Sequence, residues 1–494
     1  MPPSPSLPPS SLSPCILVAR FLRDNNYEQT LATFLEEAGL PPETGASTLE
    51  LRDENWTIEK IMEEKNVFDK SLAFERVARG EGQDGWKIPA PSTPTRLETP
   101  STSNLLSVTV QPYIKSSEDG HPEESSMIIA TGADKRVSVF EIGAPHPLIA
   151  TYEDLVDSPI LCGIPLYDGA YRAMTTMSGQ LVLFRGPKVI ASRKDHNKYA
   201  VSVVAFQEEP PEVQTAWLAT AGWDSRIYIY RITVPDVGAL LSIGEPLAVI
   251  KTATLPECIH FMRNQGTRDL VLLASRRDST NLYYYLVDSP FNRLQRADTI
   301  NVNSPKLYEC PLLGKQNLAP HSNAWVAFSP ACFALSPRDP TLLAVATSSQ
   351  PYMKLMFVRV LMPSPASRQG SAPRATQALQ AMADLGIQNR EDAAIIAQVN
   401  TMAPQTAYSI PQVVWRPDGS GVWVNGEDGV IRGIEAKTGK LVVSLEGGHE
   451  PGSKVRSIWA GWVRMQNGGN GLEERLVSGG FDKKLIIWTP GHGW

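Results

Sequence analysis

The sequence predicts a mostly β protein, a radial array of seven short β-sheets preceded by an α-helical segment. Beyond residue 103, apolar runs of four to eight residues rich in Val, Ile, Tyr and Trp are separated by Gly, Asp and Pro, the pattern of short strands and turns. Strand–turn–strand segments recur in this region, and helical apolar spacing precedes it. The length of 494 residues exceeds one ordinary compact core, which favours a repeat architecture.

The composition predicts a folded protein of a reducing compartment. Hydrophobic residues make up 42% and charged residues 20% of the chain, and no apolar run or N-terminal leader has the length needed for membrane insertion or secretion. The five cysteines stand singly, without a CxxC pair. Residues 13–80 hold 8 basic and 13 acidic residues, so most of the net charge of −6 lies there. We therefore expect a cytoplasmic or nuclear protein that binds neither membranes nor nucleic acid.

The N-terminal region predicts two short helices. Residues 1–13 are rich in Pro and Ser and are expected to be disordered. Ser13 as N-cap and Pro14 as first helical residue predict the start of a helical hairpin over residues 14–40. Apolar residues recur at helical spacing from Ile16 to Leu22 and again from Tyr27 to Leu35. A helix pair this small cannot bury its apolar stripes alone, so self-association is expected.

This helical segment resembles the LisH motif. Tyr27, Thr30, Phe34 and Glu37 match its pattern, while Asn26 replaces the usual glycine before the Tyr and tolerates the same left-handed geometry. LisH segments dimerise, so the resemblance implies a homodimer. The implied dimerisation residues are Leu17, Phe21, Tyr27, Thr30, Leu31 and Phe34. The alternative is an ordinary amphipathic hairpin packed on the rest of the chain.

Two connecting segments follow the helix pair. Residues 41–80 predict an acidic helical extension, with helical stretches at 56–64 and 69–79. Residues 81–103 contain four prolines among Ser and Thr, which predicts a semi-extended, Pro-rich linker between two domains.

The remaining residues 104–494 contain seven copies of one strand–turn–strand unit. Three copies align without gaps, each with a Gly step and an Asp in the turn, at residues 128–142, 218–232 and 476–490. Four copies are more divergent, at 173–184, 272–287, 342–360 and 421–436. Further strands flank most copies, and four strands per repeat is the signature of a propeller blade.

This array resembles the WD-repeat β-propeller family, which implies a seven-bladed WD-repeat β-propeller. The repeat marks are degenerate, because only Gly448-His449 keeps the Gly-His dipeptide and Trp488 is followed by Thr489. The resemblance implies two hydrogen-bonded structural networks within the blades. One consists of His449, Ser478, Asp482 and Trp488, and the other of His196, Thr220, Asp224 and Tyr230. A Ser478 inside a strand, without an oxyanion hole, is not expected to act as a nucleophile.

Two features lie outside the plain repeat. The chain ends near the third strand of blade seven, so a segment near residues 96–99 is expected to supply the missing strand and close the ring. An insertion at about 362–392, placed between blades five and six, predicts a helix from Ala375 to Leu385 that Gly386 ends. This helix is expected either to cap the propeller or bind a partner, or to be a surface excursion without a ligand.

The sequence contains no phosphate-binding, zinc-protease, hydrolase or dinucleotide motif and no metal-ligand cluster, so we expect no enzyme activity, metal or cofactor. Trp223 to Arg226 reads WDxR, a ligase-docking motif, but it falls in a turn rather than at a strand end. Trp223, Phe481 and Arg277 occupy turn positions on the loop face and are expected to be neighbouring partner-binding residues, or to pack on adjacent loops.

Together these patterns predict a non-enzymatic protein-interaction scaffold that dimerises through the LisH-like segment and binds partner proteins on the propeller face. One alternative is a component or substrate receptor of a ubiquitin ligase complex, because LisH and propeller domains recur together there. The other alternative is a hydrolase that uses the central channel of the propeller.

Overall fold

The computed structural model describes residues 14–46, 58–59, 86, 88–116, 122–208, 215–233, 241–289, 307–321, 328–363, 377–464 and 471–491. The chain divides into two compact units, residues 1–74 and 75–494. The predicted disorder of residues 1–13 and most of the predicted helical extension over 41–80 lie outside the described residues.

The N-terminal unit contains a helical hairpin. Helix α1 spans Pro14–Asp24 and helix α2 spans Glu28–Glu37. Asn26 adopts a φ of 59° in the turn between them, so the residue that replaces the LisH glycine takes the left-handed geometry expected of it. Ala19, Leu31 and Leu35 are buried between the helices. Two or three turns of helix thus share a very small core, which is why such a pair depends on further packing.

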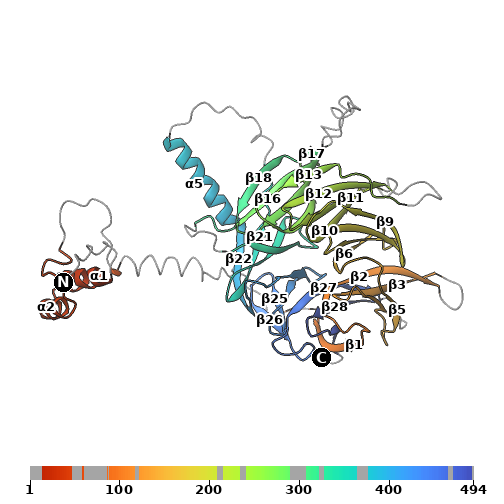
Figure 1. The fold of residues 1–494 in the computed structure, drawn as a ribbon, viewed down its shortest axis with the longest axis horizontal. Helices are drawn as coiled ribbons and strands as arrows, with labels where there is room; N and C mark the ends of the chain where they lie inside the picture. Colours follow the sequence, from red (N-terminus) through yellow and green to blue (C-terminus); the bar gives the residue numbers. More distant parts are fainter. Residues whose placement is uncertain are drawn as a thin grey trace, which may run out of the picture. The chain divides into compact units, whose positions relative to one another are not determined.

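The second unit is a seven-bladed β-propeller whose sheets surround a common centre (Figure 1). In each blade the first strand lies innermost and the next strands pair antiparallel outward. The first two blades comprise β2 (Leu105–Ser116), β3 (Pro122–Gly132), β4 (Val137–Glu141) and β5 (Leu148–Tyr152), then β6 (Ile160–Leu166), β7 (Tyr171–Thr176), β8 (Gln180–Arg185) and β9 (Lys188–Lys194).

Blades three and four continue the ring. Their strands are β10 (Ala200–Gln207), β11 (Thr215–Gly222), β12 (Arg226–Thr233) and β13 (Ala248–Lys251), then β14 (Pro256–Arg263), β15 (Leu270–Arg276), β16 (Asn281–Asp288) and β18 (Leu312–Asn317). Blade three carries a fifth strand, β17 (Tyr308–Glu309), which pairs parallel to β13.

Blades five to seven complete the ring. Their strands are β19 (Pro330–Leu335), β20 (Leu342–Thr347), β21 (Tyr352–Arg359) and β22 (Ile395–Pro404), then β23 (Val413–Trp415), β24 (Gly421–Val424), β25 (Ile431–Glu435) and β26 (Leu441–Leu445), and finally β27 (Val455–Arg464), β28 (Leu472–Gly480), β29 (Leu485–Pro490) and β1 (Pro91–Leu97).

The core of the propeller lies between successive sheets. Ile129 of blade one packs with Met174 of blade two, and Trp423 of blade six packs with Trp488 of blade seven, all within 3% of complete burial. The strands are apolar on both faces because each sheet is covered on both sides by its neighbours. Stability therefore comes from every blade contacting the next, in a closed series.

The ring closes through β1, which pairs antiparallel with β29 in register Thr95↔Ile487. This confirms the prediction that a segment just before blade one closes the ring, and the C-terminal end of the chain lies beside β1 (Figure 1). The predicted Pro-rich linker over 81–103 is wrong for residues 91–97. Pro91 and Pro94 lack a donor, but an edge strand tolerates proline.

Trp86, immediately before this strand, fills a slot between blades six and seven. Its ring packs edge-on against Trp423 at 5.1 Å and lies under the guanidinium of Arg416 at 4.2 Å. Two glycines leave room for it, since a Cβ on Gly433 would approach the Trp86 ring to 2.3 Å and one on Gly421 would approach it to 2.6 Å. The glycines admit the ring, and the ring holds the chain that leads into β1.

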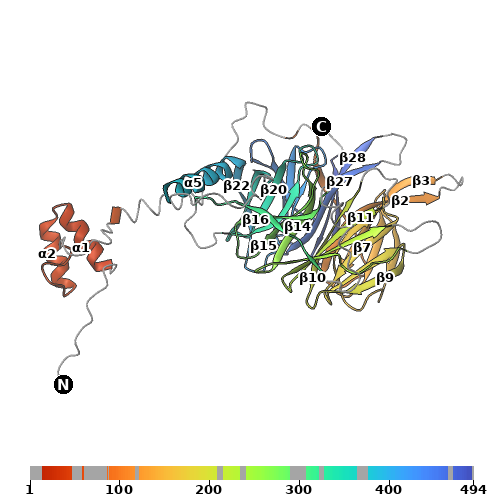
Figure 2. The same ribbon diagram turned by 90° about the horizontal axis from the view of Figure 1, so that it is seen from above.

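The insertion departs from its predicted place and length. Residues 362–392 lie between β21 and β22, inside blade five, because β22 pairs with β21 as the outermost strand of that blade. Helix α5 spans Gln377–Ala394 and runs through Gly386 directly into β22, projecting from that strand (Figure 2). A single glycine costs a helix only about 1 kcal/mol relative to Ala. Near its end, Glu391 accepts a hydrogen bond from the Asn317 N–H, fixing α5 to β18.

Candidate partner-binding surface

In blade seven the Asp turn is held by a buried polar network. Nδ1 of His449 lies 3.0 Å from Oδ2 of Asp482, and its Nε2 lies 2.8 Å from Oγ of Ser478. Trp488 donates its indole N–H to the same Oγ at 2.9 Å. All four predicted residues are thus brought together. They come from β28, β29, the turn between these strands, and the loop before β27. With every polar atom directed at a partner, the arrangement serves to fix the turn.

Blade three repeats the arrangement with one change. His196 lies 2.9 Å from both Oδ1 of Asp224 and Oγ1 of Thr220. Tyr230, at the position equivalent to Trp488, donates its hydroxyl to Oδ2 of Asp195 at 2.9 Å. The smaller phenol thus links the turn network to the Asp195–Arg193 ion pair on the previous blade.

The turn carboxylates are stabilised in their charged form. Burial would raise the pKa of Asp482, but hydrogen bonding and charge from His449, with the N–H groups of Glu450 and Lys484, outweigh it and lower that pKa. The pKa of Asp224 is likewise lowered by His196 against the effect of burial. Ionised aspartates therefore pre-shape these turns at neutral pH.

The turns put the three predicted partner-binding residues on one face of the propeller but not side by side. Trp223 lies in the turn before β12 and packs on Tyr199 at 5.1 Å, and Arg277 lies in the equivalent turn of the adjacent blade, paired with Glu257 at 2.6 Å. Phe481 belongs to blade seven, and two blades separate it from either. The expectation that all three are neighbours is wrong, because consecutive repeats form consecutive blades and blade seven adjoins neither blade three nor blade four.

Phe481 lines a depression on this face, between blades five, six and seven. The loop from β22 to β23 forms one wall and the loop from β26 to β27 another, with the turns of blades six and seven between them. Tyr408 is 88% exposed at its edge, and Ile410 is 45% exposed. Aromatic and aliphatic side chains that water reaches so freely are typical anchors for a partner.

Two polar residues of this depression escaped prediction from the sequence. Both carboxamide atoms of Gln405 are buried without a hydrogen-bond partner, which costs a fold about 1–3 kcal/mol. Arg456 is half-buried, burial lowers its pKa, and no ion pair to it occurs among the described residues. No motif marks either residue. The only sequence signal was their position in the repeat. Gln405 lies before the first strand of blade six, and Arg456 lies within the first strand of blade seven.

The inner strands also carry ionisable groups that burial holds neutral. Burial lowers the pKa of His260 on β14 to about 4 and raises the pKa of the Cys162 thiol on β6. In the described part of the chain no three His, Cys, Asp or Glu side chains are placed to hold a metal ion. None of the described helices combines the length and apolar character needed to cross a bilayer.

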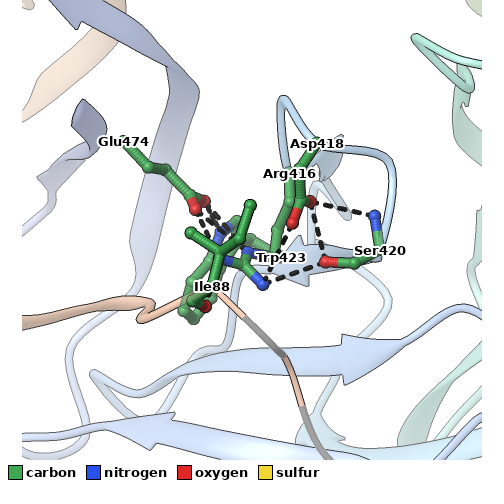
Figure 3. A network of polar contacts seen from close by, with 6 residues as sticks. All are labelled: Ile88, Arg416, Asp418, Ser420, Trp423 and Glu474. Atoms are coloured by element: carbon green, nitrogen blue, oxygen red, sulfur yellow. Dashed lines mark hydrogen bonds and ion pairs between the residues drawn. The ribbon is translucent and has the colours of Figure 1, made fainter. Parts of the chain in front are cut away.

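A second buried cluster lies where blades six and seven meet (Figure 3). Arg416 at the end of β23 is fully buried and contacts Glu474 of β28, Ser420, and the Ile88 carbonyl, to which it donates at 3.0 Å. Trp423 donates its indole N–H to Glu474 at 3.2 Å. Because the cluster links β28 and the residue that follows β23 to the segment before β1, it supports the closure of the ring.

Comparison with known proteins places both units in one family. A search of curated proteins finds no match. The model of the UCP007778 LisH domain matches residues 16–41, a range that includes α2 and all of α1 except its first two residues. The model of the UCP007778 beta-propeller domain matches residues 101–489, more than three quarters of the chain. With its helical hairpin and its seven-bladed ring, the chain therefore belongs to the UCP007778 family, whose members combine a LisH domain with a β-propeller domain.

Proposed function

We propose that the protein is a non-enzymatic interaction scaffold that dimerises through residues 14–40 and binds partner proteins on the Asp-turn face of its propeller, in the cytoplasm or the nucleus. The observation that carries the proposal is the pairing of a LisH domain with a closed propeller in one chain. The two units supply different halves of the activity: one brings chains together and the other presents a binding face.

The shape of the helix pair supports its proposed role in dimerisation. Leu31 is buried inside the hairpin, whereas Tyr27 is 52% exposed and Leu17, Phe21 and Phe34 are half-buried. An isolated hairpin thus leaves much of its apolar surface in water. A second copy covering the outer part of that stripe would remove it from solvent, with Leu31 supporting the interface from beneath.

The propeller face supports the proposed role in partner binding. Trp223 and Arg277 project from neighbouring turns, and Phe481 lines the depression on blades five to seven. Buried networks hold the turns that carry Trp223 and Phe481, so a partner would meet pre-organised loops, which reduces the entropy lost on binding. Two such faces in a dimer would raise the effective concentration of each weak site for a bivalent partner.

Affinity capture from a cell extract tests the binding half of the proposal. The tagged full-length protein is compared with Trp223→Ala, with Phe481→Ala, and with Trp462→Ala as the matched control. Trp462 is a comparably exposed aromatic near the far end of β27, away from the Asp turns. We expect partners recovered with the wild type and the control to be depleted at least several-fold by one of the first two variants. Equal recovery with all four proteins would refute the proposed face.

A further inference from the structure

One position near the start of each innermost strand bridges to the next blade. Oγ of Ser457 in blade seven accepts the Val108 N–H of blade one at 3.0 Å. Oε1 of Gln412, just before β23 of blade six, accepts the Ile458 N–H of blade seven at 2.9 Å. These side chains tie one inner strand to the next. By strand register, the equivalent residues, here called the inner belt, are Ser107, Cys162, Ser202, Cys258, Cys332, Gln412 and Ser457.

In blades four and five the inner belt uses thiols for the same bridge. Sγ of Cys258 in blade four accepts the Phe333 N–H of blade five at 3.4 Å. The thiol of Cys332 in blade five interacts in the same way with the Val413 N–H of blade six. Sulfur is a weaker acceptor than a hydroxyl oxygen, and Ser457 makes the bridge with a hydroxyl. Bridging alone therefore gives no reason for two thiols at consecutive belt positions.

The two thiols lie against each other at the seam between blades four and five. Sγ of Cys258 is 3.6 Å from the carbonyl oxygen of Phe333, the residue that follows Cys332, and the two thiols interact directly. Both cysteines are half-buried, so a small solute can reach them. The contact with Cys258 lowers the pKa of Cys332 more than burial raises it, while the same contact and burial raise the pKa of Cys258. Cys332 is therefore the first of the pair to ionise.

This arrangement meets the chemical requirements of an oxidisable dithiol. The thiolate is the nucleophile toward a peroxide, and the sulfenic acid that results condenses with a thiol within reach. We propose that Cys332 and Cys258 form a peroxide-sensitive pair, which hydrogen peroxide oxidises to a disulfide that joins blades four and five. The inference goes beyond the scaffold function and does not depend on it.

The reaction has two steps. The Cys332 thiolate attacks one oxygen of hydrogen peroxide, so that an S–O bond forms, the O–O bond breaks, and the departing hydroxide takes up a proton to become water. Cys258 then attacks the Cys332 sulfur, so that the S–S bond forms, the S–O bond breaks, and the second hydroxide leaves as water with the thiol proton. The two thiols lose two electrons, and the peroxide is reduced to two waters. A dithiol reductant reverses the oxidation.

The other cysteines are placed differently. Cys162 belongs to the inner belt, but Ser202 of blade three stands between it and Cys258. Cys310 is buried just after β17, and Cys15 is an exposed residue of α1 in the other unit. The structure thus predicts one disulfide within the propeller and assigns it to a single pair.

Mass spectrometry tests the assignment on the full-length protein. The reduced protein is freed of reductant and treated with a small molar excess of hydrogen peroxide, the remaining thiols are blocked, and the digest is mapped. We expect two of the five thiols to be lost and the Cys258–Cys332 disulfide to exceed any other pairing at least tenfold. Dithiothreitol should restore both thiols. Cys15→Ser, which removes the exposed thiol, should give the same yield.

Serine variants separate the two roles. Cys332→Ser should lower the oxidation of Cys258 at least tenfold, because the attacking thiol is gone. Cys258→Ser should leave a sulfenic acid on Cys332 that dimedone traps. Cys162→Ser is the matched belt control and should keep the disulfide yield within twofold. Because Ser occupies the equivalent position in blade seven, all three variants should melt at the temperature of the reduced wild type.

Several results would overturn the proposal. One is a folded wild type that forms no Cys258–Cys332 disulfide, or forms it only after denaturation. Another is a loss of yield in Cys162→Ser as large as that in Cys332→Ser. A third is dimedone spread evenly over the remaining cysteines of Cys258→Ser. If a serine variant proves unstable, the disulfide map of the wild type decides alone.

Discussion

Arg416 and Glu474 form a fully buried ion pair across the boundary between blades six and seven, with Nη2 of the arginine 2.7 Å from Oε2 of the glutamate and side chains 0% and 1% exposed. Arg416 also binds the Ile88 carbonyl, and its guanidinium covers the ring of Trp86. The pair therefore joins three parts of the chain that are distant in sequence, one of which is the segment that leads into the ring-closing strand β1.

Breaking this pair from one side is predicted to be much worse than removing both partners. Arg416→Met leaves Glu474 buried without its counter-ion and should lower the free energy of unfolding by about 3–5 kcal/mol. The double variant Arg416→Met/Glu474→Leu should recover most of that loss. Denaturant unfolding of the full-length protein measures both. A double variant as unstable as the sum of the two single variants would show that the ions do not compensate each other.

Trp86 is predicted to hold β1 against β29. Trp86→Ala empties the slot beside Trp423, which should speed amide hydrogen exchange in residues 91–97 and 485–490 at least tenfold, while exchange in blades two to four stays unchanged. Ile88→Ala is the matched control, since Ile88 is 39% exposed and contributes its backbone carbonyl. Similar exchange in both variants would mean that the strand pairing alone closes the ring.

The Asp482 turn is predicted to lose stability in acid. The folded pKa is lowered, so the ionised carboxylate stabilises the fold above its unfolded pKa of about 3.9, and this contribution is lost as the pH falls through the folded pKa. Asp482→Asn should destabilise the protein at pH 7 by about 1–3 kcal/mol and make unfolding less steeply dependent on pH below 4. An unchanged acid dependence in thermal melts would contradict the assignment.

His260 is predicted to act in a different pH range. Its folded pKa of about 4 lies below the unfolded value of about 6.5, so the fold favours the neutral ring. Stability is complete above pH 6.5 and falls as the pH drops from 6.5 toward 4, by at most about 3 kcal/mol. His260→Gln should remove this dependence between pH 6.5 and 4 in denaturant titrations. Wild type with constant stability over that range would show that water reaches the ring.

The repeat could be predicted from sequence because each blade reuses one local pattern. The segments ending at Ile142, Ile232 and Pro490 share apolar spacing, a Gly step and a turn Asp, and all three form the central strands of a blade. The turn networks were implied by the resemblance to the WD-repeat family, and the contacts of His449 with Asp482 and Ser478 agree with it. Local chemistry is visible in a single sequence when it recurs.

The features that were missed depend on contacts between distant segments. Nothing near Trp86 in the sequence reveals that Gly421 and Gly433 leave space for its ring. The predicted position of the insertion, between blades five and six, was wrong. Only the pairing of β22 with β21 shows that β22 belongs to blade five. The side-chain amide atoms of Gln405 are buried without a hydrogen-bond partner, and an absent contact leaves no local pattern in the sequence.

The mass of the full-length protein in solution tests the central claim, that the LisH domain presents two propellers together, most directly. Size-exclusion chromatography with light scattering should give the wild type twice the chain mass of 54.1 kDa. The control Ala32→Asp, at an exposed position of α2, should give the same doubled mass. Phe34→Asp should give the mass of a single chain, while the melting temperature of its propeller stays unchanged. A wild type of 54.1 kDa, or a Phe34→Asp variant that remains a dimer, would contradict the account.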